Sequence, residues 1–160
     1  MSLALLPSAL RALVERERVD VQVVSSTEAA HTAEEAARIL GVRVADIVKT
    51  LILTDGERCA AAIAPGDRRV DRARVAALVG SRKLRFADAD EVLARTGYPP
   101  GGVAPLAFAQ PLSVVVDDSL TDPPGRTVVA GGGRPELLIR LTVDTIVRIN
   151  GATVATICPT

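Results

Sequence analysis

Apolar side chains recur along the chain with two spacings, and each spacing predicts one type of element. Spacings of three and four residues, together with capping residues, predict helices near residues 3–17, 33–40, 71–79, 88–96 and 143–149. Alternation and runs of β-branched residues predict strands over residues 19–23, 47–54, 58–64, 83–86, 112–116, 127–130, 137–141 and 154–158.

Two short motifs indicate how these elements begin and connect. Thr32 and Glu35 form the pattern of a capping box at the start of the second helix. Asp55 and Gly56 stand between two apolar runs, which predicts a hairpin. Helices and strands do not alternate regularly, so we expect an α+β (mixed α/β) fold with a barrel-like, mostly antiparallel mixed sheet and short flanking helices. The length predicts a single domain over residues 1–160.

Composition excludes several classes of protein. No apolar run approaches the roughly 18 residues that a membrane-spanning helix needs. Cys59 and Cys158 are far apart, so neither a zinc site nor a disulfide scaffold is expected. His31, the only histidine, is a candidate general base without a recognisable triad around it. We therefore expect a soluble, cytoplasmic protein with reduced cysteines, no metal or other cofactor, and no membrane partner.

Lys49 is the first candidate for a functional side chain. The chain contains 17 arginines and two lysines, and Lys49 lies inside the apolar strand predicted over residues 47–54. A strand lysine either points to solvent or holds an anion such as a phosphate as a compact positive charge. Because arginine supplies 17 of the 19 cationic side chains, we favour the second interpretation.

Two glycine-rich segments are candidates for main-chain contact with a ligand. Residues 98–105 contain three prolines and two glycines, which predicts a shaped loop. The N–H groups of such a loop are able to bind a carbonyl or an oxyanion, but a structural turn explains the composition as well. Residues 131–133 are three glycines after an apolar strand, and a simple bend is the alternative there.

The charges of the whole chain cancel, but two neighbouring segments carry opposite net charges. The 19 basic and 19 acidic residues give a net charge of zero. Residues 57–85 carry eight basic and three acidic side chains, whereas residues 86–125 carry six acidic and one basic. The basic segment is either a solvated helix face or a surface for a phosphate backbone. Phe86, Tyr98 and Phe108 are the only aromatic residues, so we expect little stacking on bases.

Together, these segments resemble the YbaK and prolyl-tRNA synthetase-associated editing-domain family, the free-standing aminoacyl-tRNA deacylases. The matching segments are TAEEAARILGV (32–42), IVKTLIL (47–53), DADEVLARTGYPPGGVAP (88–105), VVVDDSL (114–120) and VVAGGG (128–133). Each segment is weak alone, but their order over nearly the whole chain is specific.

The resemblance implies hydrolysis of the ester that joins a wrong amino acid to the terminal adenosine of a tRNA. The resemblance also implies that water, assisted by a ribose hydroxyl of the substrate, attacks the ester without a side-chain nucleophile. Lys49 is then expected to anchor the phosphate or ribose end. The expected substrate-binding positions are Gly101, Gly102, Val103, Ala104 and Pro105, whose loop orients the carbonyl through its N–H groups, and Gly131, Gly132 and Gly133, which border the same pocket.

Substrate specificity does not follow from the resemblance, because Ala104 stands where many relatives have Ser or Pro. tRNA(Pro) carrying Ala or Cys is the first expected substrate, followed by Ser- or Thr-charged tRNA. The expected partners are the acceptor end of the mischarged tRNA and a cognate aminoacyl-tRNA synthetase, and the oligomeric state is left open. Two alternatives remain: a non-catalytic tRNA- or nucleotide-binding module of the same fold, and a hydrolase of small acyl esters.

Overall fold

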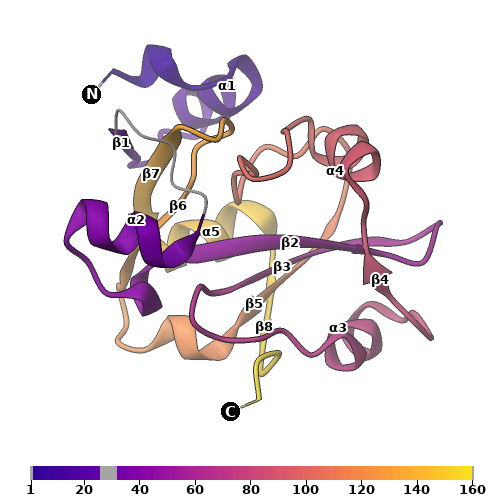
Figure 1. Cartoon of the computed structure of the whole chain (residues 1–160). Coiled ribbons are helices and arrows are strands. Elements are labelled where there is room, and N and C mark those ends of the chain that lie inside the picture. Colours follow the sequence, from indigo (N-terminus) through magenta and orange to yellow (C-terminus); the bar gives the residue numbers. More distant parts are fainter. Residues whose placement is uncertain (1, 26–31, 160) are drawn as a thin grey trace.

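The computed structural model of the protein describes residues 2–25 and 32–159, so the candidate base His31 lies outside the described residues. The helices are α1 (Ser8–Arg16), α2 (Ala33–Leu40), α3 (Arg72–Val79), α4 (Ala89–Thr96) and α5 (Val143–Asn150), with short 3-10 turns at η1 (Leu3–Leu5), η2 (Val44–Asp46) and η3 (Asp118–Thr121) (Figure 1). No helix in these two ranges is both long and apolar enough to cross a membrane.

The strands form two sheets. They are β1 (Gln22–Ser25), β2 (Val48–Thr54), β3 (Cys59–Pro65), β4 (Arg85–Phe86), β5 (Ser113–Asp117), β6 (Thr127–Gly131), β7 (Leu137–Thr142) and β8 (Thr153–Ala155). One sheet has the order β4-β2-β3-β5-β8, with parallel pairs β3–β5 and β5–β8 and antiparallel pairs elsewhere. The other is antiparallel, with the order β1-β7-β6. The expected α+β class and mostly antiparallel pairing are therefore confirmed.

The expected barrel-like closure is wrong. Among the described residues, the two sheets are joined by one isolated bridge, between Ile47 and Val129. Since the ladder of one sheet does not continue into the other beyond this bridge, both sheets remain open.

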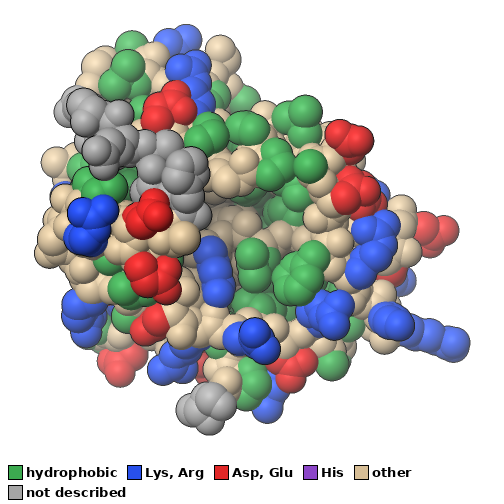
Figure 2. Space-filling model, in the orientation of Figure 1, with side chains coloured by type: hydrophobic (Ala, Val, Ile, Leu, Met, Phe, Trp, Pro, Cys, Tyr) green, Lys and Arg blue, Asp and Glu red, His purple; other side chains and the backbone are tan. Residues whose placement is uncertain are grey.

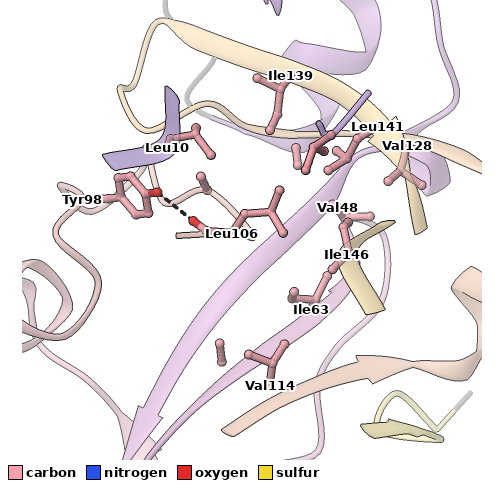
Figure 3. Close-up of a cluster of buried hydrophobic side chains, with 14 of the residues drawn as sticks. Leu10, Val48, Ile63, Tyr98, Leu106, Val114, Val128, Ile139, Leu141 and Ile146 are labelled. Atoms are coloured by element: carbon pink, nitrogen blue, oxygen red, sulfur yellow. Dashed lines mark hydrogen bonds between the residues drawn. The ribbon is translucent and has the colours of Figure 1, made fainter. Parts of the chain in front are cut away.

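A shared apolar core holds the two sheets together. Figure 3 shows side chains of both sheets gathered in it, with Val48, Ile63 and Val114 from the larger sheet and Val128, Ile139 and Leu141 from the smaller one. Residues of α1 and α5 complete this core. The opposite face of β3 packs against α3, and the opposite face of the smaller sheet packs against α2. Helix α2 and the larger sheet are thus brought next to each other at the start of β2.

Local signals predicted most elements closely, and the differences have physical causes. Pro7 divides the predicted helix over 3–17 into η1 and α1. Val19 donates its N–H to the Val14 carbonyl (3.0 Å) and so still belongs to the end of that helix. The first strand, expected over residues 19–23, is therefore β1 (Gln22–Ser25). The last strand ends early because the N–H groups of Ile157 and Cys158 donate to the buried Asp117 carboxylate (3.0 and 2.9 Å).

Candidate functional site

Lys49 lies in the first half of β2, where one edge of the strand is open. β3 pairs with the whole of the other edge, and β4 reaches only the far end of β2. At that end, the Ile52 carbonyl accepts a hydrogen bond from the Ala87 N–H (2.9 Å). Main-chain groups in an antiparallel strand point alternately to the two sides. The N–H and carbonyl of Thr50, two residues earlier, therefore face the open edge.

The Lys49 side chain is directed to the loop between β3 and α3. Its ammonium group donates a hydrogen bond to the Arg68 carbonyl, and the side chain is half-buried. An ammonium carries three N–H donors, so two remain for a ligand. The Lys49 ammonium is thus tied by a hydrogen bond to the loop between β3 and α3.

A pocket of about 260 Å³ opens beside Lys49. It is lined by Thr32, Ala33, Ala36, Ile47, Val48, Lys49, Thr50, Leu51, Gly101, Val103, Gly131 and Leu138. These residues come from the start of α2, the open edge of β2, the loop after α4, and the β6–β7 hairpin. Figure 2 shows the hollow at the centre of this face, with Lys and Arg side chains below it and to its right.

The two glycine-rich segments predicted from the sequence dock against each other at this pocket. A Cβ atom on Gly102 would lie 2.8 Å from the carbonyl carbon of Arg134. A Cβ atom on Gly131 would overlap the carbonyl oxygen of Val103. Glycine allows this main-chain approach because it has no Cβ atom. The loop of residues 98–105 therefore takes its position from the end of β6.

Two side chains fix the same loop from behind. The buried Tyr98 hydroxyl donates to the Leu106 carbonyl (2.7 Å; Figure 3). The Asn150 side chain of α5 donates to the Pro105 carbonyl (2.8 Å). Burial raises the pKa of Tyr98 well above its usual value, so its hydroxyl stays protonated and continues to donate. Hydrogen bonds from these two side chains thus tie the pocket wall to the core.

The structure brings four of the predicted site residues to one pocket. Lys49, Gly101, Val103 and Gly131 all line it. The Gly102 N–H, in contrast, donates to the Pro99 carbonyl within the turn (3.0 Å). Among the N–H groups expected to orient a carbonyl, that of Gly102 is therefore already engaged.

The remaining predicted positions lie behind the pocket wall. Ala104 and Pro105, at the end of the loop, are buried, and Ala104 belongs to the main core. The Gly132 N–H donates to the Leu137 carbonyl (2.9 Å), and Gly133 is buried. In this structure these residues shape the wall and do not line the pocket.

Thr32 and Thr50 line the pocket but were not identified as site residues from the sequence. The Thr32 hydroxyl accepts a hydrogen bond from the Glu35 N–H (3.1 Å), so the residue caps α2 and also borders the pocket. The sequence showed only the first role. Thr50 adjoins Lys49, but its exposure depends on where β4 stops, which is a tertiary feature.

A second, more polar pocket of about 390 Å³ adjoins the first at Lys49. Three cations, Lys49, Arg68 and Arg69, line it together with two carboxylates, Glu34 and Asp67, so cations are in excess there, and we call it the cationic pocket. Both arginines belong to the basic segment predicted from the sequence and are exposed. The site thus consists of a largely apolar pocket next to a polar one in which cations outnumber carboxylates by three to two, an arrangement that suits a ligand with a small apolar end and a phosphate.

Other cations of the basic segment are engaged in ion pairs. Arg85 contacts Glu91 (2.7 Å), and Arg74 contacts Asp71 (3.7 Å). The hydrogen bonds from Arg85, together with one from the Asp88 N–H, lower the pKa of Glu91 to about 2. These two arginines are therefore weaker candidates for phosphate contact than Arg68 and Arg69.

The site offers no thiol nucleophile and no metal cluster among the described residues. Burial raises the pKa of Cys59, and burial with help from the nearby Asp117 charge raises that of Cys158 to about 11. Both thiols are free and buried, so they are protonated at neutral pH. Across residues 2–25 and 32–159, no three His, Cys, Asp or Glu side chains are grouped to hold a metal ion.

Known proteins resemble this chain in both sequence and structure. The chain is 35% identical over 88 residues to a proline–tRNA ligase from Solidesulfovibrio magneticus (54% of this chain and 15% of the ligase). It is 36% identical over 105 residues to that from Nitratidesulfovibrio vulgaris strain DP4 (65% of this chain and 18% of the ligase). The chain thus spans less than a fifth of the length of these ligases.

Solved structures match almost the entire chain. A crystal structure described as that of a candidate trans-editing enzyme for prolyl-tRNA synthetase superposes with a TM-score of 0.85 at 33% identity, covering 97% of this chain and 99% of that one. The crystal structure of a hypothetical protein gives a TM-score of 0.86 at 33% identity, covering 95% and 100%. The family model of the aminoacyl-tRNA editing domain matches residues 27–149. This chain belongs to the aminoacyl-tRNA editing-domain family.

Proposed function

We propose that the protein deacylates mischarged aminoacyl-tRNA in trans, at the pocket beside Lys49. tRNA(Pro) carrying Ala or Cys is the first candidate substrate, and Ser- or Thr-charged tRNA is the next. The acceptor end of the tRNA is the proposed partner, a cognate synthetase is a second one, and the cytoplasm is the proposed location. Membership in the editing-domain family supports this proposal.

The observation that carries the proposal is the arrangement of charge and main chain around one small pocket. Lys49 stands at the junction of the pocket and its cationic neighbour. The loop residues Gly101 and Val103 line the same pocket, beside Gly131. A phosphate at Lys49 and a carbonyl at the loop therefore place an ester between two groups that the core holds in position.

The volume and the lining of the pocket beside Lys49 favour a small aminoacyl side chain. The lining includes the apolar residues Ala33, Ala36, Ile47 and Val48, and the pocket volume is about 260 Å³. A methyl or thiol group is compatible with such a wall. Thr32 and Thr50 add two hydroxyls at the lining, which also allows a hydroxylated substrate.

In the proposed reaction, water is the nucleophile. Its oxygen adds to the ester carbonyl carbon, the carbon–oxygen bond to the ribose breaks, and the ribose oxygen leaves with a proton. The products are a free amino acid and a tRNA. Main-chain N–H groups at the pocket stabilise the charge that develops on the carbonyl oxygen, and the Lys49 ammonium holds the phosphate or ribose end. Among the described residues, no carboxylate or imidazole lines this pocket, so the neighbouring ribose hydroxyl is the proposed proton relay.

A panel of mischarged tRNAs tests the proposed function. The full chain is incubated with tRNA(Pro) carrying Ala, Cys or Pro, and with Ser- and Thr-charged tRNA, and the released amino acid is measured. We expect turnover of at least one mischarged species and none of correctly charged prolyl-tRNA. Salt-dependent tRNA binding without release would favour the non-catalytic module, and turnover of small acyl esters alone would favour a hydrolase without a tRNA partner.

A further inference from the structure

Phe86 is the aromatic residue that the fold leaves exposed. It lies on β4, and 50% of its surface is accessible, whereas Tyr98 is 2% exposed. Phe108 is packed against the main core. Single exposed apolar residues are common on protein surfaces, so exposure alone carries no functional meaning. The position of Phe86 relative to the site is the informative feature.

Phe86 stands between two hollows that both adjoin the proposed catalytic pocket. On one side it lines the cationic pocket with Lys49, Arg68 and Arg69. On the other side it lines a groove of about 220 Å³, which shares Gly101 and other residues with the catalytic pocket. A flat apolar ring is therefore placed beside a phosphate-type site and next to the entrance for the ester.

This arrangement matches the parts of a nucleotide. A nucleotide has a flat base, a ribose and a phosphate, and in an aminoacylated end the ribose also carries the ester. With the ester in the catalytic pocket and the phosphate near Lys49 and Arg69, the base comes to the neighbouring groove. An aromatic face binds any base by stacking, since every base has a π-face.

We propose that Phe86 is the stacking platform for the terminal base of the acceptor end. This inference rests on the proposed function and adds a subsite to it. The guanidinium carbon of Arg72 lies 5.5 Å from the centre of the Phe86 ring, a cation–π contact that holds the ring from the side of α3. Phe86 also pairs with Leu53 through the main chain, which places β4 beside β2, the strand that contains Lys49. Because Tyr98 is buried and Phe108 packs against the main core, Phe86 is left to stack on one base.

Two substitutions of Phe86 test the platform, with Phe108→Leu as the control. Phe86→Leu keeps an apolar side chain without a π-face, and Phe86→Trp keeps an aromatic face. For a mischarged tRNA that the wild type hydrolyses, we expect Phe86→Leu to raise KM about tenfold with kcat nearly unchanged. Phe86→Trp should keep the KM of the wild type. An unchanged KM in Phe86→Leu would overturn the inference while leaving the proposed function intact.

A binding experiment separates the platform from catalysis. The probes are a 3′-alanylamino-3′-deoxyadenosine 5′-phosphate, whose amide is not hydrolysed, and the same compound without its base. We expect Phe86→Leu to weaken binding of the first probe about tenfold and to leave binding of the second unchanged. Equal weakening of both probes would show a merely structural role and contradict the inference. Because no turnover is needed, this result stands even if the panel of mischarged tRNAs shows no release.

Discussion

The state of Cys59 and Cys158 distinguishes a mechanism in which water attacks the ester from one in which a cysteine thiolate does. Both thiols are buried, and burial raises the pKa of each, that of Cys158 to about 11. A thiol is a nucleophile only as the thiolate, and the thiolate fraction at neutral pH is small here. Among the described residues that line the pocket, Lys49, Thr32 and Thr50 carry the polar side chains, and none of them is a thiol.

We predict that the double variant Cys59→Ala, Cys158→Ala retains ester hydrolysis. Its kcat should stay within about twofold of the wild type, because neither thiol takes part in the proposed reaction. Stability is expected to fall by about 1 kcal/mol for each truncated buried side chain. Amino-acid release and urea unfolding are measured on the same preparation. A loss of turnover in a variant that is still folded would indicate a thiol nucleophile and contradict the water mechanism.

At the scale of elements, the docking of the loop over residues 98–105 on the end of β6 builds the pocket wall. Gly131 makes this contact possible, since a Cβ atom there would overlap the Val103 carbonyl oxygen. Gly125 provides a matched comparison. Its φ is +77°, and no atom lies within 4 Å of the position that a Cβ atom would take, so alanine there meets backbone strain but no neighbour.

We predict that Gly131→Ala displaces the loop and lowers kcat/KM at least tenfold, because small misplacements of positioning groups are costly. The overlap should also lower the free energy of unfolding by about 1–3 kcal/mol. Gly125→Ala should cost about 1 kcal/mol of stability and leave hydrolysis unchanged. Equal activity of the two variants would mean that the docking of these segments does not matter for the reaction.

Local elements could be predicted from the sequence, whereas the site could be predicted only in part. The cap at Thr32 and the turn at Asp55 and Gly56 are set by neighbouring residues, so α2 and the β2–β3 hairpin follow the pattern closely. The roles of Thr50 and Phe86 depend on where β4 ends against β2, which is a contact between distant segments. That the sheets stay open also depends on distant segments, because in the described part of the chain a single bridge, between Ile47 and Val129, joins them.

At the scale of the whole molecule, the uneven charge distribution determines which part of the surface binds a polyanion such as tRNA. Net charge is zero, yet Arg68 and Arg69 stand exposed at the cationic pocket. Arg148, in the last turn of α5, is an exposed cation outside the pockets described above and serves as a control. Salt dependence of tRNA binding reports how many phosphates such cations neutralise.

We predict that Arg69→Ala weakens tRNA binding and reduces the slope of log K against log salt concentration by about 1. Arg148→Ala should leave both quantities unchanged. Binding is measured by titration at several salt concentrations with the full chain. If the two variants behave alike, tRNA does not approach the site across the cationic pocket.

The most direct test of the account is the rate of amino-acid release from the mischarged tRNA that the wild type turns over, measured for Lys49→Ala and Lys83→Ala. Lys83 is the other lysine of the chain, is exposed, and lines a separate pocket with Arg82 and Leu84. We predict that Lys49→Ala loses at least about 90% of kcat/KM, since about 1.4 kcal/mol of lost transition-state binding is a tenfold effect. Lys83→Ala should retain it. Turnover in Lys49→Ala equal to that of the wild type would contradict the assignment of this pocket as the editing site.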